Sequence, residues 1–392
     1  MPHLLCTKHD DIDISKKVDD VTFKFIAKNK LEDKICVSTQ DKTFLLTKQE
    51  KDNKNLIKID QATRVTPISI AKKALNAYGE ICEGEILFSN TANNENKLEP
   101  KKEYLKDISY FVNDFKTTKE ICVEVGFGSG RHLLYQAQEN PDILYIGLEI
   151  HTPSIEQMLK QVKILGLTNV LAINYDARLF LEFMQSNSIS RVFVHFPVPW
   201  DKKPHRRVMS IEFINECLRA LKVGGSLELR TDSPKYYEYS KELLESYPNN
   251  KHTIVKNQEL AISSKYEDRW KKQGKDIWDL TIYSNEQSQA ITLQKDFSFY
   301  LDNKVNVYEL ENKLNFNPIV KDNYFIHFDK VYISNKDLAL LSVTMGSFTK
   351  PLSIFIIFEN DSVKYFQNNP IPTSSNFNAH KLINKLLNEV CI

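Results

Sequence analysis

Strand-like and helix-like hydrophobic patterns alternate through the middle of the chain. Short apolar runs such as ICVEVGF, LYIGLEI and RVFVHF are separated by segments such as SIEQMLKQVKILG and IEFINECLRALK, in which apolar residues recur every three or four positions. The first pattern is typical of buried strands and the second of amphipathic helices. Their alternation predicts an α/β domain over residues 106–285, with a doubly wound, Rossmann-like and largely parallel sheet.

The two flanking regions have a β-rich pattern. Residues 1–105 contain the short runs VTFKFIA, KICVST, KTFLLT and NLIKID, followed by the helix-like ISIAKKALNAY, which predicts a small β-meander or half-barrel. Residues 286–392 contain further strand-like runs, from DFSFYL and NVYEL to SIFIIFE, and end with AHKLINKLLNEV at helical spacing. We interpret this region as a separate small α+β module, so the sequence predicts three domains.

Composition and charge narrow the class of protein. A length of 392 residues with 42% hydrophobic residues supports more than one sizeable core, and the net charge of +1 leaves nucleic-acid binding to local basic patches. We find no signal peptide and no apolar run long enough to span a bilayer, so we expect a cytoplasmic protein without a membrane partner. The six cysteines include no CxxC pair, and we expect reduced thiols, no disulfide framework and no metal site.

The motif EVGFGSG is the sharpest chemical signal. Glu124 ends a strand, and Gly126, Gly128 and Gly130 follow at alternate positions. Such a turn allows the backbone to approach a ligand closely, because glycine has no Cβ atom. A dinucleotide-binding loop would carry a further glycine where Arg131 stands. The pattern therefore favours a nucleoside-carrying ligand without a pyrophosphate, such as S-adenosylmethionine; a turn kept only for packing is the alternative.

Two further acidic residues follow the next two strands. Glu149 ends LYIGLE, where a carboxylate can accept hydrogen bonds from ribose hydroxyls, and Asp176 follows VLAINY, where it can accept from an adenine amino group. Open α/β sheets bind ligands at the carboxyl ends of their strands. Either residue alone could be a solvated loop acid, but three acids in this order favour a cofactor site.

The segment VFVHFPVPWDKKPHRR follows the fourth strand. Pro197 cannot donate to a β-ladder, so it ends the strand and stiffens the turn. Lys202, His205, Arg206 and Arg207 then form a basic cluster that favours binding to RNA phosphates over the alternative of a merely solvated loop.

These motifs together resemble those of the bacterial tRNA (guanine-N7-)-methyltransferases. The matching segments are, in order, EVGFGSG, IGLEIHTPS, NYDA, FPVPWDKKPHRR, RTDSPKYY and SSKYEDRWKKQGKDIWDL, within residues 120–285. The resemblance implies an enzyme that transfers a methyl group from S-adenosylmethionine to N7 of a guanine in tRNA, typically in the variable loop.

The resemblance also implies roles for individual residues. The acids Glu124, Glu149 and Asp176 match cofactor-binding positions, and Lys202 and Asp232 match substrate-binding positions. The substrate-contacting tetrad is matched by Ser264, Lys265, Tyr266 and Glu267. We expect a second basic cluster, Lys265, Arg269, Lys271 and Lys272, to contact the tRNA backbone together with the first.

Val198 is the one serious departure from this pattern. The family motif usually reads Phe-Pro-Asp-Pro-Trp, and its aspartate, generally counted as catalytic, is replaced here by valine. Guanine N7 has a lone pair and no proton, so methyl transfer needs no general base. Asp201 or Asp232 could supply a substitute acceptor, and we expect an active enzyme. The alternatives are a weakened or inactive RNA-binding relative of the same fold, and a methyltransferase for another acceptor.

Overall fold

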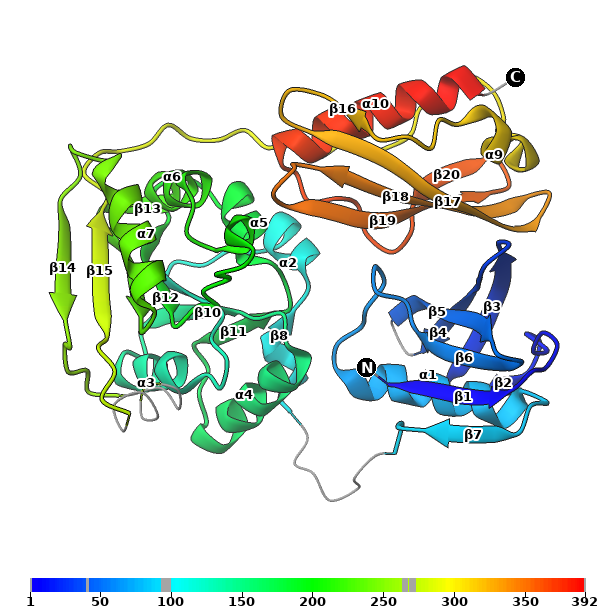
Figure 1. Cartoon of the computed structure of the whole chain (residues 1–392), viewed down its shortest axis with the longest axis horizontal. Helices are drawn as coiled ribbons and strands as arrows, with labels where there is room; N and C mark the ends of the chain where they lie inside the picture. The colour runs from blue at the N-terminus through cyan, green and yellow to red at the C-terminus, as the bar shows by residue number, and fades with distance from the viewer. Residues whose placement is uncertain (1, 40–41, 93–99, 263–266, 268–272, 391–392) are drawn as a thin grey trace. The chain divides into compact units, whose positions relative to one another are not determined.

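Segments near both ends of the chain combine into one unit, and the middle of the chain forms a second. The computed structural model describes residues 2–39, 42–92, 100–262, 267 and 273–390 (Figure 1). Unit 1 consists of Met1–Lys97 and Gln294–Ile392, and unit 2 consists of Leu98–Leu293. The two flanking regions, which the sequence pattern treats as separate modules, come together in unit 1.

One sheet runs through the described part of unit 2, in the order β14-β15-β13-β12-β9-β10-β11-β8. Its strands are β8 (Leu105–Lys106), β9 (Glu120–Val125), β10 (Ile143–Leu148), β11 (Val170–Ile173), β12 (Ile189–His195), β13 (Leu221–Thr231), β14 (His252–Lys256) and β15 (Trp278–Tyr283). All neighbours from β8 to β13 are parallel, whereas β15 is antiparallel to both β13 and β14. The sheet confirms the predicted doubly wound α/β fold and places the RVFVHF strand beside the glycine-loop strand.

Helices connect the strands of this sheet. They are α2 (Ile108–Asn113), α3 (Arg131–Glu139), α4 (Thr152–Leu165), α5 (Ala177–Phe183), α6 (Ile211–Ala220) and α7 (Pro234–Glu245) (Figure 1). Leu133 of α3 and Met158 of α4 share one buried cluster with Tyr145 and Val170 of the sheet, while α5 packs against α6. This packing fixes the loops at the carboxyl ends of the parallel strands.

The described part of unit 1 also contains one sheet, with the order β20-β19-β18-β17-β3-β4-β5-β6-β1-β7 and with β2 and β16 beside it. The N-terminal strands are β1 (His3–Thr7), β2 (Lys17–Val18), β3 (Val21–Lys28), β4 (Asp33–Thr39), β5 (Lys42–Lys51), β6 (Lys54–Ile59) and β7 (Ile86–Ser89). The C-terminal strands are β16 (Ile319–Val320), β17 (Phe325–Asn335), β18 (Leu338–Gly346), β19 (Pro351–Glu359) and β20 (Ser362–Tyr365). The consecutive antiparallel pairs from β3 to β6 confirm the predicted meander.

Contacts between the two halves of unit 1 explain why they form one unit. Ile333 of β17 pairs with Lys28 of β3, and the Tyr332 hydroxyl donates a hydrogen bond to Glu32 at 2.6 Å. A shared buried cluster contains Phe25, Ala27, Cys36 and Leu45 from the first half and Tyr332, Leu340, Phe355, Ile357 and Phe366 from the second. Neither half would cover this apolar surface alone.

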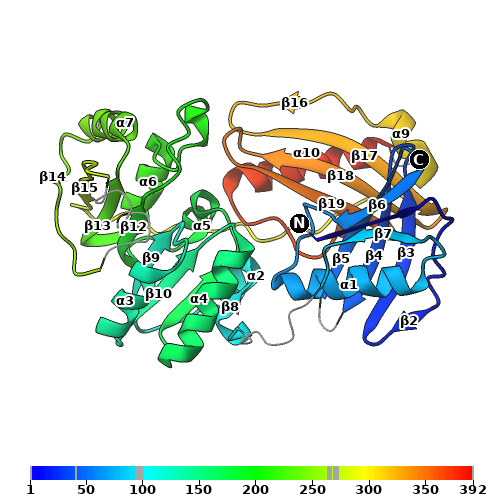
Figure 2. The same cartoon turned by 60° about the horizontal axis from the view of Figure 1, so that its bottom comes forward.

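Helices cover both halves of unit 1. Helix α1 (Ile68–Ile81) lies along the N-terminal strands (Figure 2), where Leu75 and Tyr78 share a buried cluster with Phe23 and Ile35. Helix α10 (Ser374–Val390) packs on β17 and β18, and it begins five residues before the segment AHKLINKLLNEV that the sequence pattern predicted as helical.

Two strand predictions in the C-terminal region were wrong. Residues 296–301 have no regular structure, and NVYEL forms η3 (Val307–Glu309) and the start of α9 (Leu310–Lys313). Asn306 accepts the N–H of Tyr308 and so favours this helical turn.

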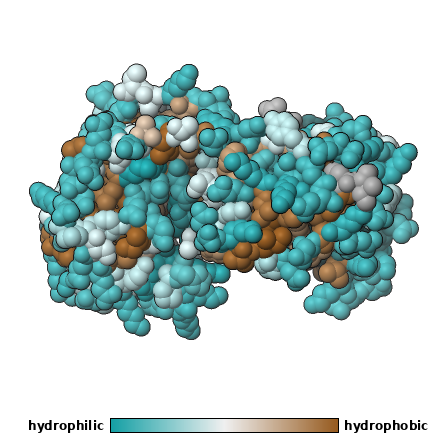
Figure 3. All heavy atoms as spheres, turned by 90° about the horizontal axis from the view of Figure 1, so that it is seen from above, coloured by the Kyte–Doolittle hydropathy of each residue, from teal (hydrophilic) through white to brown (hydrophobic). Residues whose placement is uncertain are grey.

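Hydrophilic residues cover most of the face drawn in Figure 3, and hydrophobic residues gather in patches between them. Among the described residues, no helix has the length and apolar character required to cross a membrane.

Candidate active site

The glycine-rich turn joins β9 to α3. Gly126 and Gly128 have φ angles of 67° and 53°, in the left-handed region that favours glycine. A Cβ atom added at Gly126 would meet no atom within 4 Å, and one added at Gly128 would meet only the Gly126 carbonyl oxygen at 4.0 Å. The turn therefore faces open space that a ligand can enter.

Gly130 has a different reason to be glycine. Its φ is 73°, and an added Cβ would lie 2.5 Å from Cγ of Met158. Because Met158 belongs to α4, Gly130 lets the start of α3 pack closely on that helix. The packing alternative considered for the turn thus explains one of its three glycines.

Glu149 binds the glycine-rich turn. Its Oε2 atom accepts the N–H of Gly128 at 2.9 Å, and Oε1 accepts the N–H groups of Ile150 and His151 at 2.8 and 2.9 Å. The carboxylate is half-buried beside the open face of the turn. A carboxylate offers about four acceptor positions, so beside these three backbone donors one position remains for a ligand hydroxyl, and a second hydroxyl would share an oxygen with a backbone donor.

Asp176 caps α5. It accepts the N–H of Arg178 at 2.9 Å, and its Oδ2 atom lies 2.7 Å from Nη2 of the same arginine. The Asp176 side chain is 36% exposed. An adenine amino group at this position would therefore share the carboxylate with Arg178, a partner that the sequence interpretation did not foresee.

Strand register brings the three acidic positions to one edge. Leu148 of β10 lies opposite Val125 of β9 and Ile173 of β11. Glu124, Glu149 and Asp176 therefore all lie at the carboxyl ends of adjacent parallel strands, as the sequence predicted.

Glu124 is buried against a histidine. Its Oε2 atom lies 2.8 Å from Nδ1 of His132, on the first turn of α3. Burial opposes protonation of His132, but the charge of Glu124 and its hydrogen bond outweigh burial and raise the pKa of this imidazole above its ordinary value. His195 lies beside it with ring centroids 4.3 Å apart, and its pKa is well below the ordinary value because of burial, His132 and Arg230.

The two histidines line a cavity of about 270 Å³ together with Gln136, Glu228, Gln258 and Asp279. Sequence reasoning gave neither histidine a role. Their positions in the sequence could have indicated that they lie near the site, since His132 follows the glycine-rich turn by two residues and His195 is the last residue of β12.

The loop after β12 has a strained backbone. The N–H of Phe196 donates to the carbonyl oxygen of Arg230 at 2.7 Å. Phe196 and Trp200 have φ angles of 50° and 46°. Non-glycine residues in this region are strained, and they cluster at functional sites. Val198, between these two residues, is 60% exposed.

Arg207 holds this loop from inside. Its guanidinium Nε donates to the carbonyl oxygen of Pro199 at 2.8 Å, and its Nη2 lies 3.5 Å from Oδ1 of Asp201. The guanidinium carbon lies 4.5 Å from the ring centroid of Tyr239 and 5.3 Å from that of Tyr236. With only 8% exposure, Arg207 is placed to shape the loop rather than to grip RNA phosphates as expected.

The other basic residues of the loop are on the surface. Lys202, His205 and Arg206 are exposed, and the Arg206 guanidinium carbon lies 5.2 Å from the Trp200 ring centroid. Both substitute acceptors considered for the missing aspartate have basic neighbours: Asp201 lies near Arg207, and Asp232 lies 3.3 Å from Lys275.

Glu267 belongs to a buried ion-pair network. Arg230 is 1% exposed and donates to Glu267 at 2.9 Å and to both carboxylate oxygens of Asp279 at 2.6 Å. This placement fixes Glu267 beside Arg230, near the end of β13. The remaining residues expected to contact tRNA here, Ser264, Lys265, Tyr266, Arg269, Lys271 and Lys272, lie outside the described residues.

The site defines a class of protein. An open glycine-rich turn and the Glu149 carboxylate lie together at the carboxyl edge of a doubly wound sheet, which is where open α/β sheets bind ligands. Residues 118–280 match the family described as "Putative methyltransferase". The fold and the site together identify unit 2 as a methyltransferase domain.

Similar proteins identify the family. The tRNA (guanine-N(7)-)-methyltransferase of Wolinella succinogenes is 39% identical over 99% of this chain and 100% of its own length. The proteins of the same name from Campylobacter fetus subsp. fetus and Helicobacter hepaticus are 38% and 37% identical over 99% of this chain, and the matches cover 99% and 100% of their lengths. The chain belongs to the tRNA (guanine-N(7)-)-methyltransferase family.

One solved structure shows a distant similarity. The one described as "Crystal Structure of 16S rRNA Methyltranferase KamB" is 15% identical, with a TM-score of 0.36, and the match covers 48% of this chain and 96% of that one. A similarity this low carries no argument about the site.

Proposed function

We propose that the chain transfers a methyl group from S-adenosylmethionine to N7 of a guanine in tRNA, forming 7-methylguanosine. The observation that carries this proposal is the 39% identity to a tRNA (guanine-N(7)-)-methyltransferase over nearly the whole chain. The open turn at Gly126 and Gly128, with Glu149 beside it, supports a donor site. We place the acceptor guanine in the variable loop, and the activity in the cytoplasm with its tRNA substrate.

The donor would be held by residues at the carboxyl edge of the sheet. Gly126 and Gly128 leave room for close approach, Glu149 would accept the ribose hydroxyls, and Asp176 would accept the adenine amino group. Glu124 is buried and hydrogen-bonded to His132, so we propose that it forms the buried polar side of the donor site. When bound, S-adenosylmethionine supplies a methyl group on a positively charged sulfur.

The transfer itself needs little acid–base help from the protein. The lone pair of guanine N7 forms the new bond to the methyl carbon while the carbon–sulfur bond breaks, and no proton moves. Orienting the two reactants can contribute about 7–11 kcal/mol. We propose that the strained loop from Phe196 to Arg207 provides this orientation, so an exposed valine at position 198 is compatible with activity.

Exposed basic residues of the loop would hold the tRNA. Lys202, His205 and Arg206 can contact backbone phosphates, and Asp232 can accept hydrogen bonds from the guanine edge. Arg207 is excluded from this group because its guanidinium is buried against Tyr236 and Tyr239.

A labelled-methyl assay tests the proposal directly. The full-length protein is incubated with tritium-labelled S-adenosylmethionine and an unmodified tRNA transcript, and the digested nucleosides are separated. We expect label in 7-methylguanosine, and none when the variable-loop guanine is replaced by adenosine. Retained tRNA binding without any methylated nucleoside would favour the inactive RNA-binding alternative, whereas a different methylated nucleoside would favour another acceptor.

A further inference from the structure

Three side chains of metal-ligand type converge in unit 1. Cys6 lies in β1, His9 in the loop that follows, and Cys82 at the end of α1. Their ligand atoms, two Sγ atoms and one imidazole nitrogen, all lie within 4.8 Å of one another. None of the three belongs to the candidate active site. Because Cys82 is distant in sequence and no CxxC pair is present, the sequence predicted no metal site.

The spacing of the ligand atoms suits a tetrahedral ion. The Sγ atom of Cys6 lies 3.5 Å from Nε2 of His9. Zinc binds thiolate sulfur at about 2.3 Å and imidazole nitrogen at about 2.0–2.1 Å, so a tetrahedral angle separates the two atoms by about 3.6 Å. The observed separation matches the one that a shared zinc ion would give, and in the metal-free protein it is also that of a thiol–imidazole hydrogen bond.

The imidazole of His9 is set in the form that binds a metal. Its Nδ1 atom lies 2.6 Å from the carbonyl oxygen of Asp10, which can only accept a hydrogen bond. Nδ1 must therefore carry the ring proton, and Nε2 keeps its lone pair on the side of the cysteines. Metal-binding histidines almost always donate their second nitrogen in this way.

The backbone around the cluster is adapted to it. The pairing of β1 with β7 shifts register between Leu5 and Cys6, and such bulges re-aim side chains beside functional sites. At Gly84, an added Cβ would lie 2.5 Å from Cδ2 of His9. Glycine at this position thus leaves room for the imidazole next to Cys82.

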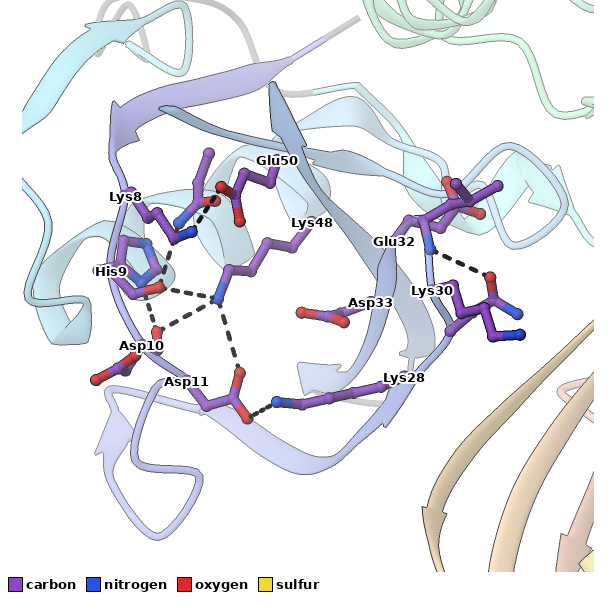
Figure 4. A pocket seen from close by; sticks show the side chains of 13 residues that line it. Lys8, His9, Asp10, Asp11, Lys28, Lys30, Glu32, Asp33, Lys48 and Glu50 are labelled. Atoms are coloured by element: carbon purple, nitrogen blue, oxygen red, sulfur yellow. Dashed lines mark hydrogen bonds and ion pairs between the residues drawn. The ribbon is translucent and has the colours of Figure 1, made fainter. Parts of the chain in front are cut away.

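Lys48 holds the loop that carries His9 (Figure 4). Its ammonium group donates to the carbonyl oxygens of His9 and Asp10, both at 3.3 Å, and lies 3.7 Å from Asp11. His9 lines a cavity of about 580 Å³, while Cys6 is fully buried and Cys82 is half-buried. Of the three ligand residues, only His9 lines this cavity, and Lys48 fixes the loop that carries it.

We propose that Cys6, His9 and Cys82 bind one zinc ion that ties the end of β1 to the end of α1. Two thiolates and a neutral imidazole neutralise a divalent cation, and this mixed sulfur and nitrogen set matches the ligand preference of zinc. Three protein ligands leave the fourth tetrahedral position to a water molecule. Binding releases the thiol protons to solvent and changes no oxidation state.

Metal analysis of the full-length protein tests this site. The protein is reduced, stripped with a chelator, mixed with zinc sulfate and freed of excess metal on a desalting column. We expect one zinc per chain and a higher melting temperature than in the stripped protein. The Cys82→Ala and His9→Gln variants should lose stoichiometric zinc, whereas Cys36→Ala should retain it, because Cys36 is a buried thiol of another cluster in the same unit.

Cobalt provides a second readout that does not depend on stability. The stripped protein with Co²⁺ should show thiolate-to-cobalt charge-transfer absorption and the intense visible bands of tetrahedral cobalt, and His9→Gln should lose both. Circular dichroism identifies a variant that fails to fold. If one of Cys82→Ala and His9→Gln does so, the metal content of the other variant tests the proposal. Equal substoichiometric zinc in wild type and Cys82→Ala overturns the proposal, as does a Cys6–Cys82 disulfide whose reduction creates no zinc binding.

Discussion

The Nε atom of Arg207 donates a hydrogen bond to the carbonyl oxygen of Pro199 at 2.8 Å, from the buried side of the loop that follows β12. This contact joins the basic end of the loop to its proline turn. Packing of the guanidinium against Tyr239, 4.5 Å away, fixes the arginine in turn. Arg207 thus fixes the loop from its buried side, while Lys202, His205 and Arg206 are exposed on it.

Arg206 and Arg207 should have separable effects. We expect Arg207→Ala to lower the melting temperature and kcat, because a buried hydrogen bond to a charged group contributes about 1.5–3 kcal/mol. Arg206→Ala should cost at most about 0.5–1 kcal/mol, from its contact with the Trp200 ring, and reduce the salt slope of tRNA binding by about 1. Thermal unfolding and binding titrations at several salt concentrations measure both. If Arg207→Ala reduced the salt slope of tRNA binding and kept the wild-type melting temperature, Arg207 would be an RNA contact and not a residue that shapes the loop.

Glu149 should dominate donor affinity. Glu149→Ala removes the acceptor for Gly128 N–H and for the proposed ribose hydroxyls. Since charge-assisted hydrogen bonds contribute about 1.5–3 kcal/mol, the Kd for S-adenosylmethionine should rise roughly 10- to 150-fold in calorimetry. Glu139→Ala, an exposed acid on α3, is the matched control. If Glu149→Ala and Glu139→Ala bound S-adenosylmethionine with equal affinity, Glu149 would not be the acceptor for the ribose hydroxyls.

The glycines of the turn should divide into two groups. Gly130→Ala combines a positive φ with a 2.5 Å contact to Met158, so we expect a loss of about 1–3 kcal/mol in the free energy of unfolding. Gly126→Ala has open space for its methyl group, so we expect a smaller loss of stability and a clearly weaker donor affinity. Urea unfolding and calorimetry distinguish the two outcomes. A Gly130→Ala protein of wild-type stability would contradict the packing role.

The Glu124–His132 pair should stabilise the protein at low pH. The pKa of His132 is raised in the folded state, so its contribution is complete below the ordinary value of 6.5 and is lost as pH rises through the folded pKa. The melting temperature of wild type should therefore exceed that of His132→Gln by more at pH 6 than at pH 9. His205→Gln, at an exposed position, is the matched control. A gap that is independent of pH would mean that the imidazole stays neutral.

Val198→Asp tests whether the missing carboxylate limits the enzyme. Because position 198 is 60% exposed, the change should alter stability by no more than about 0.5 kcal/mol. We expect kcat to change less than about tenfold, since guanine N7 requires no base. A gain of two orders of magnitude in single-turnover assays would show that loop geometry alone is insufficient.

The sequence predicted most of unit 2 because its signals are local. Continuous apolar runs define β9, β10 and β12, and parallel pairing then brings Glu124, Glu149 and Asp176 to one edge. The role of Arg207 was missed because the tyrosines that bury it come from α7, far along the chain. A run of basic residues looks the same in sequence whether its members face solvent or the core.

Unit 1 shows the same limit at a larger scale. The meander from β3 to β6 follows from turns between neighbouring runs, but nothing near Lys28 in sequence indicates its pairing with Ile333. The convergence of Cys6, His9 and Cys82 likewise depends on how α1 packs on the sheet. Contacts between distant segments are set by tertiary packing, which local hydrophobic periodicity does not encode.

The shared cluster of unit 1 also sets an order of events during synthesis. Residues 1–97 are synthesised before any residue of unit 2. Phe25 and Leu45 nevertheless remain uncovered until Tyr332 and Phe355, which follow unit 2 in sequence, have been synthesised. Unit 2, which is continuous in sequence, can fold while unit 1 is still half made. The apolar face that includes Phe25 and Leu45 therefore stays uncovered until β17 to β20 have been synthesised, and an exposed apolar face of this kind favours aggregation of the nascent chain.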